Sequence, residues 1–367
     1  MTVTEQPTAS PATVGPIDVV EEIDTPRRPQ AMGRRDRLEM VVALGSGISV
    51  SIVLCVLLDW RHPLTFGIWA ALGTLVVEWF LVGDRLGRVA ATDRVVTFLV
   101  WMCGAVAVGV LGWMLGYVIV KGLPGLTAGF FTQDLSDVGP LNPGGGALHA
   151  IIGTLEQTAI ATVIAVPVGI MTAVYLNEIK GRMSPAVRFV TDAMSGLPSI
   201  VAGLLIYTLW VVRFGFSGIA AAMALTVVML PIIVRTSEEM LRTVGNSLRE
   251  ASLALGAPEW RTVMGVVLPT ARSGLVTASI LGVARVVGET APLLLTAFGS
   301  ASIRLNPLSG QQADLPLFVY SLIRQPNAVQ IQRAWTGALV LIGIVLVLFV
   351  LARVISGRGD RIRKGSR

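Results

Sequence analysis

Long apolar stretches, separated by short polar segments, dominate the pattern of this chain. Eight of them approach or exceed the roughly 20 residues that a helix needs to cross about 30 Å of hydrocarbon. They are predicted to be helical because a helix satisfies its own backbone hydrogen bonds where water is absent. The expected spans are residues 39–58, 64–83, 95–120, 150–176, 189–212, 215–234, 274–298 and 334–354.

Composition supports a multi-spanning, all-α membrane protein. Of the 367 residues, 53% are hydrophobic and 14% are charged, whereas soluble domains carry roughly 25% charged residues. The two cysteines, Cys55 and Cys103, lie inside apolar stretches and offer neither a disulfide framework nor metal-ligand spacing. The two histidines, His62 and His149, lie far apart in sequence. We therefore expect no metal site.

Both ends of the chain are polar. Residues 1–38 are rich in Pro, Thr, Glu and Arg and lack apolar content, which predicts a disordered cytoplasmic tail. They do not resemble a signal peptide, because no short apolar segment with a cleavage site opens the chain. Residues 358–367 are predicted to form a basic cytoplasmic tail.

The positions of Arg and Lys orient the spans. The chain has 29 of these residues and a net charge of +6. With the N-terminus inside, 22 of them lie in inner segments, six lie in outer segments and Arg285 lies within a span. This bias predicts a multi-pass protein of the cell membrane with both termini in the cytoplasm. The positive charge then reflects orientation among membrane lipids, and no nucleic-acid partner is expected.

The longest inner segment between spans carries a motif. Residues 235–273 look helical but are too polar to span, and they include "REASLALGAPEWRTVMGVVLP". This stretch resembles the cytoplasmic loop of ABC-transporter permeases, whose pattern is Glu-Ala-Ala, three residues, Gly, nine residues, an aliphatic residue, any residue, then Leu-Pro. Ser252 replaces the second Ala, and Val266 fills the aliphatic position. The residues that the resemblance assigns to ATPase coupling are Glu250, Ala251, Ser252, Gly256, Leu268 and Pro269.

The chemistry of this motif fits a docking element. Gly256 permits a backbone turn that a side chain would hinder, so two short helices can meet at an angle. The small residues Ala251 and Ser252 allow another surface to approach closely. Such a helix pair can lie along the membrane face and enter a groove on a soluble partner. The alternative is an ordinary amphipathic helix at the membrane interface.

A narrower resemblance appears further along the chain. The stretch "ARVVGETAPLLLTA" at 284–297 is similar to the fifth core helix of phosphate-transporter permeases, and its second half favours the PstA type over the sister PstC type. Residues 144–170, 192–207 and 315–348 resemble other parts of the same family. The similarity covers roughly 95–357 and implies a type I ABC-transporter permease fold. Residues 39–94 look like two extra N-terminal transmembrane helices added to a six-helix core.

The resemblance also implies domains and partners. It places the type-1 transmembrane domain at about 147–355 and the coupling loop at about 236–272. In this family two permease subunits, here of the PstA and PstC types, sit on a dimer of PstB-type ATPases, and an outer PstS-type protein delivers phosphate. The chain itself is not expected to be an enzyme. Its three lysines complete no phosphate-binding loop, so ATP-Mg belongs to the partner ATPase and no cofactor is expected in this chain.

A charged pair stands out within the apolar span 274–298. Arg285 lies about eleven residues into that span, roughly 16 Å deep at 1.5 Å per residue, and Glu289 is expected one turn further on the same face. A charge at this depth costs upward of about 2.5 kcal/mol, so it should face protein or water. Thr290 adds a hydroxyl group nearby.

Two interpretations of Arg285 and Glu289 remain open at this point. Either the two side chains pair and hold helices together, or Arg285 presents its planar guanidinium to phosphate while Glu289 prevents the anion from binding too tightly. Arg285, Glu289 and Thr290 are thus candidate residues of the substrate path. Asp192, near a helix end, is expected to be an interfacial or capping carboxylate.

Three functions are compatible with these features. The first is a permease subunit that forms half of the translocation path of an ATP-driven phosphate importer. The second is a permease subunit for another oxyanion, such as molybdate or sulfate, against which Gly288-Glu289-Thr290-Ala291-Pro292 argues. The third is an ATPase-independent secondary transporter or channel, which would need no ATPase partner.

Overall fold

The computed structural model describes residues 34–59 and 62–364. Most of the predicted N-terminal tail, and residues 365–367 of the predicted basic tail, lie outside this part of the chain. One tail boundary needs correction, because helix α1 begins at Arg34, within the predicted disordered tail. Helix α15 continues to Lys364, so most of the predicted basic tail is helical, and its place in the cytoplasm stays a prediction. Arg, Lys and Leu favour helix, so a helix extends beyond its membrane-spanning part at little cost.

The described residues are helical throughout, apart from turns, loops and one isolated β-bridge between Phe298 and Gln312. Among the described residues, seven helices are long and apolar enough to span a membrane, and a bent helix pair makes the number up to eight. The longer elements are α1 (Arg34–Leu57), α2 (Pro63–Leu86), α3 (Arg88–Gly122), α5 (Leu148–Val174), α6 (Ser184–Gly196), α7 (Ser199–Ile206), α9 (Gly218–Arg242), α10 (Asn246–Ala254), α12 (Leu268–Val286), α14 (Leu315–Ile323) and α15 (Ala328–Lys364).

Contacts divide the chain into two units, Met1–Val110 and Leu111–Arg367, with the division inside α3. In the first unit, α1 packs along α2. A Cβ added to Gly73 would lie 2.9 Å from the Cα of Gly47, so the absence of side chains lets the two helices approach closely. The hydroxyl of Ser51 donates to the carbonyl of Phe66 at 2.7 Å and adds a polar link.

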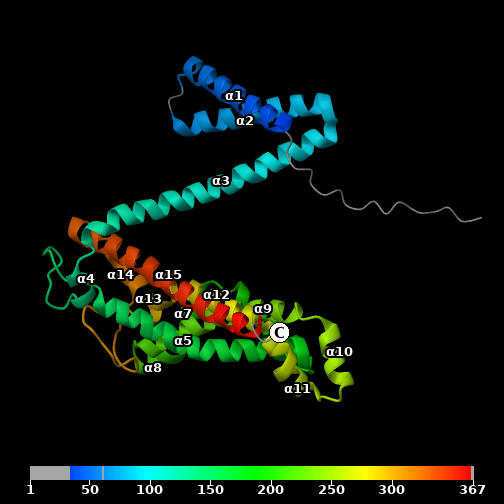
Figure 1. The fold of residues 1–367 in the computed structure, drawn as a ribbon. Helices are drawn as coiled ribbons and strands as arrows, with labels where there is room; N and C mark the ends of the chain where they lie inside the picture. The colour runs from blue at the N-terminus through cyan, green and yellow to red at the C-terminus, as the bar shows by residue number, and fades with distance from the viewer. Residues whose placement is uncertain (1–33, 60–61, 365–367) are drawn as a thin grey trace, which may run out of the picture. The chain divides into compact units, whose positions relative to one another are not determined.

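Helix α9 is the centre of the second unit. It packs against both α5 and α12, which lie beside it in Figure 1. Ile233 of α9 is fully buried between two glycines. A Cβ added to Gly169 of α5 would lie 2.7 Å from the Ile233 side chain, and a Cβ added to Gly282 of α12 would lie 2.7 Å from it as well. These contacts fix the spacing of the three helices, because a packed interior accepts an extra methyl group poorly.

The predicted span 189–212 is a bent pair rather than one straight helix. Helix α6 ends at Gly196, and the next helical segment, Ser199–Phe214, leaves it at 108°. Pro198 lies at the bend, where its ring excludes a continuing helix. A tight turn precedes the following helix, with Gly215 at φ +83°.

The predicted span 274–298 is wrong at both ends. Helical structure begins at α11 (Glu259–Thr262) and continues through a π-helical turn, η4 (Val263–Val267), into α12. Helix α12 then stops at Val286, and a separate short helix, α13 (Ala291–Thr296), follows. Gly288 weakens the helix at the break, and Pro292 suits the first turn of a new helix.

The polar segment predicted at 236–272 is correspondingly shorter. Its first residues complete α9, which reaches Arg242, and its last residues belong to α11, η4 and α12. Only 243–258 lies between the two long helices, and it contains α10. The polarity of Arg and Glu side chains on the last turns of α9 hid the continuation of the helix.

Candidate functional site

The candidate site is a cavity of about 420 Å³ where the α6–α7 bend, α9 and the end of α12 meet. Ser195, Pro198 and Ser199 line it from the bend, and Thr236 lines it from α9. Its charged lining residues are Arg235, Arg285 and Glu289, which leave a net charge of +1. A positively charged, concave site of this size is suited to a small anion.

Arg285 lies at the last turn of α12 and is exposed in the isolated chain. Within residues 34–59 and 62–364, neither a hydrogen bond nor an ion pair occupies its guanidinium. The structure therefore does not show the pairing with Glu289 that one of the two interpretations required. A guanidinium that lines a cavity without a protein partner has its fork of N–H donors available for a ligand.

Glu289 and Thr290 lie in the break between α12 and α13. The backbone N–H of Glu289 donates to the carbonyl of Val286 at 3.0 Å, which ends the helix with a tight turn. Glu289 consequently does not continue the face of α12, contrary to the sequence prediction, but it lines the same cavity as Arg285. Thr290 is not among the residues that line this cavity, and its place on a substrate path stays a prediction.

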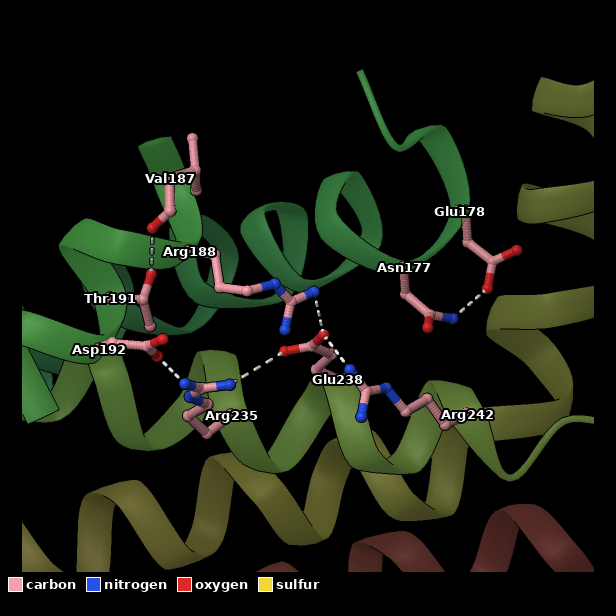
Figure 2. A network of polar contacts seen from close by, with 9 residues as sticks. All are labelled: Asn177, Glu178, Val187, Arg188, Thr191, Asp192, Arg235, Glu238 and Arg242. Atoms are coloured by element: carbon pink, nitrogen blue, oxygen red, sulfur yellow. Dashed lines mark hydrogen bonds and ion pairs between the residues drawn. The ribbon is translucent and has the colours of Figure 1, made fainter. Parts of the chain in front are cut away.

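Arg235 is the lining residue that sequence reasoning missed, because it was placed in a polar loop. It lies within α9 and forms an ion pair with Asp192 of α6, as Figure 2 shows. Its other guanidinium nitrogen lies 3.7 Å from Glu238. Arg235 thus connects the cavity to a network of ion pairs that includes Asp192. The position of Asp192 at the membrane interface stays a prediction.

Glu238 is the centre of that network (Figure 2). Its side chain is 3% exposed and lies 2.7 Å from both Arg188 of α6 and Arg242 of α9. A buried carboxylate is stable when several donors replace its lost hydration. Glu238 therefore fixes α6 against α9 next to the cavity.

The predicted coupling loop forms two short helical arms, α10 and α11, which follow the end of α9. Gly256 lies between α10 and α11 with φ +81°, a conformation that favours glycine, so the predicted turn is present. The hydroxyls of Ser252 and Thr262 lie 2.9 Å apart and join the arms. Leu255 and Trp260 are 89% and 64% exposed. Large exposed apolar side chains beside a turn suit a protein partner.

The remaining motif residues occupy distinct places. Glu250 and Ala251 are exposed on α10, while Leu268 and Pro269 begin α12. Arg249, immediately before Glu250, lies inward and contacts Glu178, four residues beyond the end of α5. No sequence signal marked this contact, because the two residues are 71 positions apart.

Comparisons with known proteins show which proteins this chain is similar to. The family model described as "Binding-protein-dependent transport system inner membrane component" matches residues 165–360. The "Phosphate transport system permease protein PstA 1" of Mycobacterium tuberculosis is 43% identical over 276 residues, which are 74% of this chain and 90% of that protein. The PstA protein of Pasteurella multocida is 36% identical over 259 residues, 70% of this chain and 88% of that protein.

Among solved structures, an inward-facing MetNI methionine ABC transporter aligns with a TM-score of 0.44 and 22% identity, covering 60% of this chain and 94% of that one. The bundle of apolar helices and the matched family model define the class of protein as a membrane-embedded transport permease. The chain belongs to the family of binding-protein-dependent transport inner membrane components, and within it to the PstA phosphate transport permeases. This membership confirms the predicted all-α permease class; the count of six core helices plus two stays a prediction.

Proposed function

We propose that this chain is a permease subunit of an ATP-driven importer of inorganic phosphate and forms half of its translocation path. The observation that carries the proposal is the cavity between the α6–α7 bend, α9 and α12, where Arg285 has neither a hydrogen-bond nor an ion-pair partner among residues 34–59 and 62–364. The names of the PstA relatives agree with this substrate.

Arg285 is the proposed phosphate contact. Its guanidinium stays charged at any physiological pH, and its fork matches two oxygens of a phosphate. Arg235 lines the same cavity but is already paired with Asp192, so it is less available than Arg285. Glu289 supplies a negative charge within the cavity, which limits the affinity for an anion and permits its release.

The loop around Gly256 is the proposed contact with an ATPase. Its exposed apolar side chains are suited to a groove on a soluble partner, and ATP-Mg binds to that partner rather than to this chain. This contact would put α10 on the cytoplasmic side of the membrane. The Arg and Lys bias supports the same side for both termini. A sister permease of the PstC type, a PstB-type ATPase dimer and a PstS-type binding protein complete the proposed assembly.

Uptake by the complete complex tests this function. The complex would be reconstituted in liposomes, with ATP inside and binding protein outside, and labelled phosphate and molybdate would be compared. We expect ATP-dependent phosphate uptake that excess molybdate leaves largely unchanged. Molybdate uptake without phosphate uptake would indicate the other oxyanion class. Phosphate uptake without any ATPase in the purified complex would indicate a secondary transporter.

A further inference from the structure

The ion pair between Arg249 and Glu178 joins the loop that carries the coupling motif to a long membrane helix. Glu178 lies in η2 (Tyr175–Ile179), a π-helical turn that directly continues α5. Arg249 lies on α10, one residue before Glu250. The pair therefore connects an element that meets an ATPase, under the function proposed above, with a helix packed along α9.

The geometry of the pair is bidentate. The Nε of Arg249 donates to one carboxylate oxygen of Glu178 at 3.0 Å, and an Nη donates to the other oxygen at 2.7 Å. Two parallel hydrogen bonds fix both distance and orientation, which a single point contact does not. The side chains are 18% and 8% exposed, so solvent and salt screen the attraction less than they would at the surface.

The same guanidinium also contacts the end of α9. Arg249 donates to the carbonyl oxygens of Leu241, at 3.0 Å, and Val244. Leu241 lies in the last turn of α9, where its carbonyl also accepts from the backbone N–H of Val244 at 3.2 Å, and Val244 itself lies two residues beyond the end of the helix. One side chain thus holds α10, the end of α9 and the end of α5 together. The hydrogen bond to Glu178 raises the pKa of Arg249, which keeps it charged.

We propose that Arg249 and Glu178 form a positioning clamp that transmits movement of the ATPase-facing loop to α5. Neither residue touches the substrate in this account; both act by making α5 follow α10. The proposal rests on the function proposed above. It extends beyond the coupling motif, because Glu178 lies 72 positions before Glu250 and outside that motif.

The ratio of phosphate transported to ATP hydrolysed tests the clamp. In the reconstituted complex, Arg249→Gln and Glu178→Gln are expected to lower this ratio roughly tenfold while ATP hydrolysis continues, a size typical of couplings between sites. The double variant should be no worse than either single variant, because both remove one interaction. Arg242→Gln is the matched control, since Arg242 pairs with Glu238 four residues earlier on its own helix.

Replacing the ion pair by a covalent cross-link distinguishes a role in transmitting movement from a role in stability alone. In a chain with Cys55 and Cys103 changed to Ser, Glu178→Cys and Arg249→Cys would be joined by a short bifunctional thiol reagent. Cross-linking should restore the phosphate-to-ATP ratio of the paired-cysteine complex, and cleaving a reducible cross-link should lower it again. An efficient cross-link that leaves the ratio low would overturn the clamp.

The wild-type complex in the same liposomes distinguishes the two proposals. Absence of ATP-dependent phosphate uptake by the wild type would refute the proposed function. Wild-type uptake, together with an unchanged ratio in Arg249→Gln and Glu178→Gln at normal complex yield, would refute the clamp alone. If the Gln variants assemble poorly, Arg249→Lys keeps the charge without the fork and is expected to assemble with a reduced ratio; a wild-type ratio in it would overturn the proposal.

Discussion

Two groups of charged residues in the second unit differ in what their charges contact. At the end of α9, Glu238 is surrounded by Arg188, Arg235 and Arg242. In the neighbouring cavity, Arg285 and Glu289 lie in the same lining but no contact joins them within the described residues. Paired charges hold helices, whereas a charge without a protein partner can act on a ligand. Arg235 belongs to both groups, so the cavity and the network share one wall.

The largest effect is expected for Arg285→Gln. Phosphate uptake by the assembled complex should fall about a hundredfold or more, because two charge-assisted hydrogen bonds worth roughly 1.5–3 kcal/mol each are lost. Complex yield should be unchanged, since in the part of the chain that the structure describes the side chain has no hydrogen bond or ion pair to lose. The measurement is the initial uptake rate of labelled phosphate, with Arg242→Gln as the control. Normal uptake by Arg285→Gln at normal yield would show that the charge is incidental.

A smaller effect, on stability rather than transport, is expected for Glu238→Gln. Removal of this charge leaves three guanidinium groups close together without their shared partner. The cost should be about 1–3 kcal/mol, below the value for a fully buried ion pair because the arginines are partly exposed. Thermal unfolding of the purified complex measures it, and Glu239→Gln, on an exposed neighbour, is the control. Equal unfolding temperatures for the two variants would contradict a structural role for Glu238.

Asp314 extends the comparison between the two groups of charged residues, because its carboxyl group is buried rather than paired. It caps α14, outside the candidate spans, by accepting a 2.8 Å hydrogen bond from the backbone N–H of Leu317. Burial raises its pKa to about 7 from 3.8. The folded state therefore binds this proton more tightly than the unfolded state, and the resulting stability is lost as pH rises from about 4 to about 7.

Asp314→Asn should remove this pH dependence, because Asn keeps an oxygen for the cap without a titrating group. Unfolding temperatures of the wild type and the variant would be compared at about pH 5 and about pH 8. We expect the variant to gain stability relative to the wild type as pH rises. A difference that stays constant with pH would show that Asp314 does not titrate in this range.

The smallest effect is expected for deletion of residues 1–92. The family resemblance begins near residue 95, and both charge groups lie beyond it, so uptake should stay within about twofold of the full chain, the scatter expected for changes remote from a site. Expression, membrane insertion and uptake would be measured together. Loss of uptake at normal insertion would show that the first two helices take part in transport or assembly.

The sequence predicted those features that depend on local pattern. The apolar stretches predicted most of the membrane-spanning helices. The glycine within a polar segment predicted the turn at Gly256. The expectation that Arg285 lies within the membrane singled out a residue that lines the cavity, because a charge in the membrane needs a protein or water environment. Breaks within apolar segments were harder to predict, since Pro198 and Gly288 interrupt a helix without changing the hydropathy of the stretch.

Contacts between distant parts of the chain were beyond prediction from one sequence. Arg188 and Glu238 are 50 positions apart, and the sequence marks each as one of many polar residues near a span end. Their pairing depends on how α6 turns back along α9, which is set by the packing of whole helices. Arg235 was assigned to a loop for a different reason, because the polar side chains on the last turns of α9 hid the continuation of that helix.

Protection of a cysteine in the cavity by phosphate is the most direct test of the central claim that phosphate enters there through Arg285. Ser195→Cys, in a chain with Cys55 and Cys103 changed to Ser, would place one thiol in the lining. Its modification rate would be measured in the assembled complex during turnover, with and without phosphate. The account predicts that phosphate slows modification and that Arg285→Gln removes this protection. An equal rate with and without phosphate, in a complex that transports phosphate, would contradict it.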